Sequence, residues 1–121
     1  MNSKAEIGRH GEEAAIAFLR KQGFLICDKN WRCGRYEIDI VAQRHGITHF
    51  IEVKTRKAGS LITPEEAITP NKVAALHHAI AAYLTQRRTV GEFEIDLIAV
   101  DMFPNGECDI RFVPNIAESH W

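Results

Sequence analysis

The feature that most constrains the fold of this chain is a pair of segments, residues 36–43 and 48–55, in which apolar and polar side chains alternate. They flank residues 44–47, a short segment that contains a glycine, and this arrangement predicts a β-hairpin. Pairing Gln43 with Thr48 keeps the apolar residues of both strands on matching faces. Because a slip by one residue would exchange the two faces, the apolar pattern selects this register.

The predicted register has a chemical consequence. It places Ile38 and Ile40 on one face and makes Asp39 and Glu52 direct cross-strand neighbours on the other, with Cβ atoms about 5 Å apart. A partly buried pair of like charges raises one pKa or recruits a cation. Hard oxygen ligands with open positions suit Mg²⁺ or Mn²⁺. The alternative is a solvated face on which Lys54 neutralises both acids.

The segment before the hairpin predicts a helix. Apolar residues at helical spacing form one stripe over residues 5–22, and Gly23 is a natural end for the helix. Gly8 and Gly11 lie inside this stripe, although glycine costs about 1 kcal/mol in a helix. Either the helix begins later than residue 5, or its first turns need a close approach of the backbone to a neighbouring element.

The other segments predict a mixed sheet with helices packed on it. Thr69 is the expected N-cap of a second helix, and Pro70 is its expected first residue. The order α-β-β-β-α-β-β is typical of the α/β or α+β class. No linker or repeat interrupts the chain, so we expect residues 1–121 to form one domain. The strands and the second helix are expected at residues 24–27, 36–43, 48–55, 70–86, 93–100 and 109–113, and polar loops at 28–35 and 56–63.

The charge balance argues against a protein that coats nucleic acid by bulk charge, because 15 basic and 16 acidic residues give a net charge of −1. A local basic patch remains compatible with that total. No apolar run approaches the roughly 20 residues of a membrane helix, and no secretory signal is visible. The three cysteines argue against a disulfide framework. We therefore expect a cytoplasmic protein with no membrane association.

The hairpin residues resemble the signature of the PD-(D/E)XK nuclease superfamily, in which an aspartate is followed on the next strand by Glu-x-Lys. Here these residues are Asp39 and Glu52-Val53-Lys54. Over nearly its whole length the chain also resembles the YraN-like family of uncharacterised bacterial proteins. The matching stretches are Gly11-Glu12-x-x-Ala15, Phe18-Leu19, Asn30-Trp31-Arg32, Glu37-Ile38-Asp39-Ile40-Val41, Phe50-Ile51-Glu52-Val53-Lys54-Thr55-Arg56, Pro70-x-Lys72 and Asn115-Ile116-Ala117.

The resemblance implies an α/β fold with a restriction-endonuclease-like αβββαβ core, a mixed β-sheet flanked by helices. It implies a metal-dependent endonuclease that hydrolyses phosphodiester bonds in branched or single-stranded DNA, with DNA favoured over RNA, acting as a homodimer. Asp39 and Glu52 would hold Mg²⁺ or Mn²⁺, and the carbonyl of Val53 and the carboxylate of Glu12 would be further ligands. Lys54 would orient or deprotonate the attacking water, or stabilise the charge that develops on phosphorus.

Other charged residues extend this expected site. Glu37 either supports the metal site or pairs with Lys54. Lys72 lies in the first turn of the second helix and opposes the helix dipole, which predicts a nearby anion, either Glu66 or a phosphate. The expected phosphate contacts are Arg32, Arg35, Arg56, Lys57 and Lys72. For each of them the alternative is ordinary surface charge.

Two aromatic residues carry separate expectations. Tyr36 stands where the family usually has glycine, so the backbone there cannot approach a substrate closely, although the ring could stack on a base. His77 lies on the apolar stripe of the second helix and is expected in the core, and the histidines show no zinc spacing.

Two other functions remain open from the sequence. One is a non-catalytic nucleic-acid-binding module of the same fold, and the other is a small interaction protein whose acids are only a solvated face. Retention of the repulsive pair of Asp39 and Glu52, together with Lys54, favours the nuclease.

Overall fold

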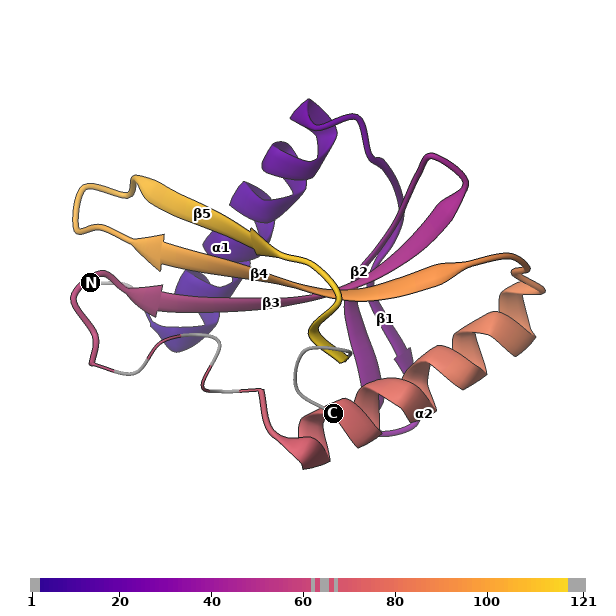
Figure 1. Ribbon diagram of the computed structural model, residues 1–121. Coiled ribbons are helices and arrows are strands. Elements are labelled where there is room, and N and C mark those ends of the chain that lie inside the picture. The colour runs from indigo at the N-terminus through magenta and orange to yellow at the C-terminus, as the bar shows by residue number, and fades with distance from the viewer. Residues whose placement is uncertain (1–2, 62, 64–65, 67, 118–121) are drawn as a thin grey trace.

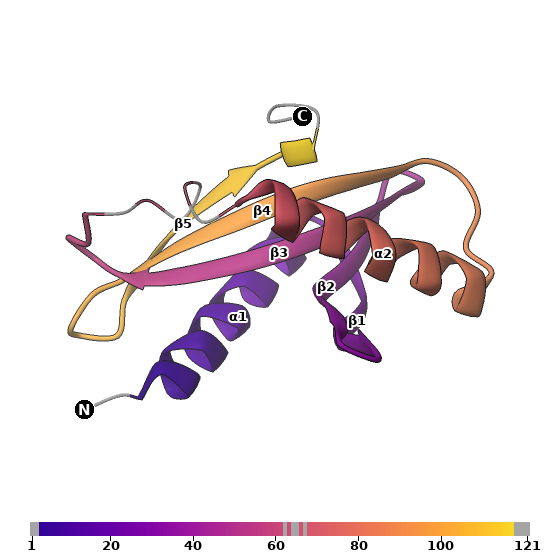
Figure 2. The same ribbon diagram turned by 90° about the horizontal axis from the view of Figure 1, so that it is seen from below.

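The computed structural model describes residues 3–61, 63, 66 and 68–117 and confirms the predicted order of helices and strands. Two helices cover opposite faces of one sheet (Figures 1 and 2). Among the described residues, no helix is long and apolar enough to cross a membrane. The elements are α1 (Lys4–Lys21), β1 (Leu25–Cys33), β2 (Tyr36–Arg44), β3 (Ile47–Lys57), α2 (Pro70–Arg87), β4 (Phe93–Met102) and β5 (Cys108–Val113).

The five strands form a mixed sheet in the order β1-β2-β3-β4-β5. Neighbouring strands are antiparallel, except that β3 and β4 are parallel and α2 lies between them in the chain. Figure 1 shows β2 and β3 side by side near their hairpin turn and then diverging. From there β2 runs with β1, and β3 runs with β4. The sheet is therefore divided at its centre.

The predicted hairpin register is confirmed from the pair of Gln43 with Thr48 to that of Ile40 with Ile51, where the pairing of β2 with β3 ends. The predicted cross-strand pair of Asp39 with Glu52 lies beyond this last pair. Asp39 directly precedes Ile40 on β2, so it lies where the two strands begin to separate. Asp39 and Glu52 therefore lie where the sheet divides.

The prediction that Ile38 and Ile40 share one face is wrong. Ile38 packs in the cluster that α2 covers, whereas Ile40 packs in the cluster that α1 covers. On β1, Trp31 pairs with Ile38 and Lys29 with Ile40, and Asn30 between them has a φ of 51°. This left-handed residue interrupts the regular alternation of the strand pair, and so the two isoleucines face different helices.

Two strands extend into segments that were predicted to be polar loops. β1 continues through the mostly polar residues 28–33, and β3 runs on to Lys57. β1 is an edge strand, and its partner β2 supplies backbone hydrogen bonds that the sequence pattern does not reveal. His77 is also placed differently from the prediction. It is exposed, since the buried face of α2 passes through Leu76 and Ile80 instead.

Helix α1 begins before both Gly8 and Gly11, so it does not start late. Only Gly11 makes the close approach to a neighbouring element that the sequence suggested. Ser3 and Glu6 form a capping box that starts the helix. A Cβ atom added to Gly11 would lie 1.9 Å from Oγ1 of Thr55 on β3, whereas one added to Gly8 would meet nothing within 4 Å. Gly11 therefore allows α1 to touch the strand that carries Glu52.

We expect Gly11→Ala to destabilise the protein by about 1–3 kcal/mol, because α1 and β3 must move apart to relieve the overlap with Thr55. Gly8→Ala is the matched control and is expected to leave stability unchanged or to raise it by about 1 kcal/mol through helix propensity. Urea denaturation measures both changes. Equal stability of the two variants would contradict the close contact.

Candidate active site

The centre of the site is the side chain of Glu52 on β3, which is only 2% exposed. Its Oε2 lies 3.0 Å from Nζ of Lys72 and 3.6 Å from Nζ of Lys54. Lys72 reaches it from the first turn of α2, which begins at the N-cap Thr69. An anion does lie beside Lys72, but it is Glu52, which the sequence did not name as its partner. The carboxylate that was named, Glu66, exchanges hydrogen bonds with Thr63 instead.

Asp39 approaches Glu52 from β2, and its carboxylate is also buried. Oδ2 of Asp39 accepts the backbone N–H of Val53 at 2.8 Å, so the side chain joins the two strands where they diverge. Burial, and then the charge of Glu52, raise the pKa of Asp39 to about 8, although the N–H of Val53 acts in the opposite direction. Asp39 thus holds a proton at neutral pH when no cation is bound.

The second oxygen of Glu52 is the unusual atom of the site. Oε1 is buried and has no hydrogen-bond partner among the described residues. An ionised carboxylate oxygen buried in this way is costly, so the site needs either a proton shared with Asp39 or a cation. Because the donors are carboxylate oxygens, the residues present fit a hard divalent ion such as Mg²⁺ or Mn²⁺.

Two further acids lie around this pair. Burial raises the pKa of Glu12 on α1, a hydrogen bond with the side chain of Asn30 opposes this, and the charges of Glu37 and Glu52 add to it. Glu12 is therefore close enough for its pKa to be raised by the charge of Glu52, which is compatible with the ligand role that the resemblance implies. Glu37 forms an ion pair with Arg32 at 3.1 Å, whereas the ion pair of Lys54 is with Glu52.

Several predicted residues gather around one cleft of about 430 Å³ between the start of α1 and the end of β3. Glu12, Val53, Arg56 and Lys57 all line it. Arg56 also forms an ion pair with Asp101 on the neighbouring strand. The cleft therefore joins two expected metal ligands to two expected phosphate contacts.

The structure does not bring all of the predicted cations together. Arg35 lies at the turn between β1 and β2 and lines a different cleft beside α2. Arg32 is close by in sequence and is mostly exposed in its pair with Glu37. The expected basic patch is thus divided between the start of α1 and the first half of α2.

Sequence reasoning missed one polar cluster, because its members meet only through the parallel pairing of β3 with β4. Nδ1 of His49 lies 2.7 Å from Oδ2 of Asp96 and 3.4 Å from Oε2 of Glu94. These three ligand atoms are close enough to hold a cation. However, Asp96 also accepts the backbone N–H of Asn115 at 3.0 Å, so both of its oxygens have partners without one. This cluster ties the backbone at Asn115 to the sheet, whereas Oε1 of Glu52 has no hydrogen-bond partner among the described residues.

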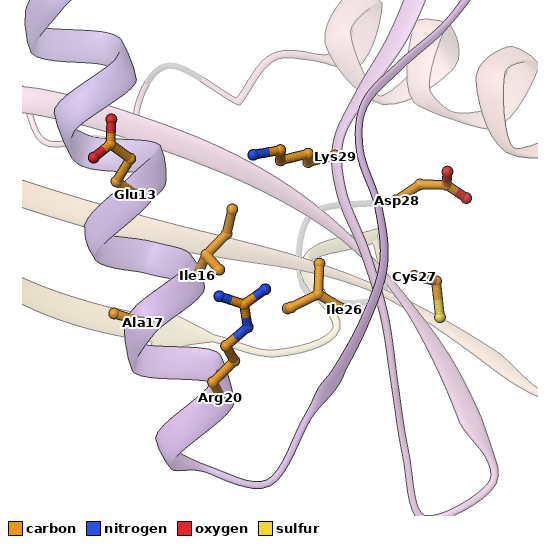
Figure 3. Close-up of a pocket in the computed structure, with 8 residues that line it drawn as sticks. All are labelled: Glu13, Ile16, Ala17, Arg20, Ile26, Cys27, Asp28 and Lys29. Carbon is orange, nitrogen blue, oxygen red and sulfur yellow. The ribbon is translucent and has the colours of Figure 1, made fainter.

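A larger cleft of about 510 Å³ lies between α1 and the edge strand β1 (Figure 3). Arg20 and Lys29 reach into it from the two elements. The two acids that line it, Glu13 and Asp28, point in different directions and offer no pair. Asp28 is bound instead by the hydroxyl of Tyr83 at 2.7 Å. Although this cleft is larger, its two acids do not face each other, so the acid pair of Asp39 and Glu52 is the better candidate for the active site.

Fold and site together define a class of protein, a mixed α/β domain with a buried acid pair and two lysines where its central strands diverge. The model of Uncharacterised protein family UPF0102 matches residues 11–100, and the chain belongs to this family. A UPF0102 protein of Pseudarthrobacter chlorophenolicus is 37% identical over 119 residues, which cover 98% of this chain and 90% of the relative. One of Leifsonia xyli subsp. xyli is 38% identical over 117 residues, covering 96% and 99%. The predicted membership of an uncharacterised bacterial family is confirmed.

The raised pKa of Asp39 predicts how stability depends on pH. An unfolded aspartate releases its proton near the ordinary value of 3.8, whereas folded Asp39 keeps it to about 8. Folding therefore takes up a proton between these values, and the free energy of unfolding of the metal-free protein falls as pH rises through this window. Asp39→Asn should weaken this fall, because an amide does not titrate.

Urea midpoints at pH 5 and pH 8 in the presence of a chelator test this prediction. Asp109→Asn changes an exposed aspartate of β5 and is the matched control. The wild type and the control should lose more stability between the two pH values than Asp39→Asn. The same loss in all three proteins would show that Asp39 titrates normally.

Proposed function

We propose that this protein is a metal-dependent endonuclease of the PD-(D/E)XK type that hydrolyses phosphodiester bonds in DNA. The observation that carries the proposal is the buried Oε1 of Glu52, which lacks a hydrogen-bond partner among the described residues and lies beside the protonated Asp39. A pair kept in this state serves no packing purpose, since two apolar side chains would be more stable there. Binding of a cation would explain why the two acids are kept together.

Asp39 and Glu52 would hold Mg²⁺ or Mn²⁺, with Glu12 and the carbonyl of Val53 as further oxygen ligands. When bound, the ion would supply activation of a water molecule and neutralisation of the charge that develops on phosphorus. Glu12 supports this assignment because α1 brings it within electrostatic reach of both acids. Glu37 contributes negative charge from the start of β2.

The two lysines have different roles in this proposal. Burial opposes the charge of Lys72, but Glu52 and the other nearby carboxylates outweigh it, so the pKa of Lys72 is raised and the side chain stays positive. Its 3.0 Å contact fixes the position of Glu52. Lys54 is more loosely bound, at 3.6 Å, and its side chain is 37% exposed. Lys54 is thus the cation available to orient the attacking water or to contact the phosphate.

The substrate is DNA in preference to RNA, recognised by structure rather than by sequence. Arg56 and Lys57, which line the cleft with Glu12 and Val53, would contact phosphates near the acid pair. Arg32 and Arg35, near the turn between β1 and β2, would contact phosphates farther along the strand, and phosphates carry no sequence information. A homodimer would place two such sites on two strands of a branched substrate.

The test is cleavage of branched, flapped and single-stranded DNA by the purified protein with Mn²⁺. Glu52→Gln should abolish cleavage, because the amide cannot replace the carboxylate as a ligand. Lys54→Ala should lower the cleavage rate at least about 10²-fold while DNA binding is retained, which is the pattern of a lost transition-state interaction. Lys21→Ala, at the exposed end of α1, is the matched control and should cleave normally.

Two results would overturn the proposal. Full turnover by Lys54→Ala would remove its catalytic role. Absence of cleavage by the wild type on every substrate, with DNA binding intact, would leave a non-catalytic nucleic-acid-binding module of the same fold.

A further inference from the structure

A cleft of about 400 Å³ lies between the turn that joins β1 to β2 and the first half of α2. The rings of Tyr36 and His78 stack in it with centroids 5.2 Å apart and planes 18° apart. The guanidinium of Arg35 lies 5.3 Å from the centroid of the Tyr36 ring. Asn71, Ala74 and Ala75 complete the lining.

The stacking in this cleft differs from the aromatic packing of the core. Trp31 and Phe50 both meet Tyr83 edge to face, with planes 79° and 80° apart. Among the ring pairs of the described residues, that of Tyr36 with His78 is the nearly parallel one. It also lies at the surface, because His78 is exposed and Tyr36 is half-buried. Flat rings, a guanidinium and two alanines suit a planar, uncharged ligand that stacks.

The position of the cleft indicates what that ligand is. Tyr36 lies three residues before Asp39 on β2, which corresponds to about 10 Å along the strand. Asn71 directly precedes Lys72, whose Nζ contacts Glu52. Both elements that line the cleft therefore lead to the acid pair, β2 over about 10 Å and α2 over one residue.

We propose that this cleft binds an unstacked nucleobase of the strand whose phosphate lies at the acid pair of Asp39 and Glu52. The base stacks with the rings of Tyr36 and His78, and Asn71 offers an amide donor and acceptor to its edge. A paired base inside a duplex cannot reach such a cleft, so the site selects single-stranded or frayed nucleic acid. The inference rests on the proposed nuclease function and specifies its substrate.

The experiment measures binding without cleavage, in a chelator, of a fluorescein-labelled single-stranded DNA 12-mer and of its duplex. Tyr36→Leu and His78→Ala should each weaken single-strand binding about tenfold or more. Tyr36→Phe keeps the ring and should bind as the wild type does. Phe103→Ala removes an exposed aromatic ring outside the cleft and is the matched control. Because Tyr36 contacts the core, His78→Ala provides the same test at an exposed position.

A second set of oligonucleotides locates the base. Single abasic sites are placed at each position of the 12-mer, and one position should weaken binding by the wild type but not by His78→Ala. Equal binding by the wild type and both cleft variants, or no position-specific effect of an abasic site, would overturn the inference. If the wild type still cleaves DNA in that case, the proposed function stands and only the base site fails. If the wild type neither binds nor cleaves, both fail.

Discussion

The repulsion between the carboxyl groups of Asp39 and Glu52 is the interaction on which the account of this site depends. Two ionised carboxylates about 4 Å apart repel each other by about 4 kcal/mol at the effective dielectric constant of a protein. The fold keeps them together despite this. As a result the pKa of Asp39 is raised to about 8, and Oε1 of Glu52 has no hydrogen-bond partner among the described residues. A divalent cation would satisfy both groups in place of the proton, so proton and metal would compete for one place.

The rest of the structure positions charges around this pair. The divergence of β2 from β3 frees the backbone N–H of Val53, and the carboxylate of Asp39 accepts it. Gly11 lets α1 approach β3 closely, which brings the neighbouring Glu12 to the site. The cap of α2 sets the position of Lys72, which compensates Glu52 from the opposite face of the sheet. Each helix thus contributes one charged group through a local feature, Gly11 in the middle of α1 and the N-cap Thr69 of α2.

The alternation of residues 36–43 and 48–55 predicted the hairpin register, because a slip would have exposed its apolar face. The same pattern could not predict that Ile38 and Ile40 face different helices, since this depends on the left-handed Asn30 of the neighbouring strand. Nor could it join Lys72 to Glu52, because a basic residue in a first turn predicts an anion without identifying it. The cluster of His49 with Asp96 was missed for a similar reason, since β3 and β4 are joined only through α2.

The exchange of the Asp39 proton for a cation is tested most directly by calorimetric titration of the protein with Mn²⁺ at pH 7 in two buffers that differ in ionisation enthalpy. The difference in heat between the buffers gives the number of protons released for each ion bound. If the ion replaces the proton of Asp39, the wild type should release about one proton, and Glu52→Gln should bind Mn²⁺ much more weakly. Binding by the wild type without proton release, or equal affinity in Glu52→Gln, would contradict a metal site at this acid pair.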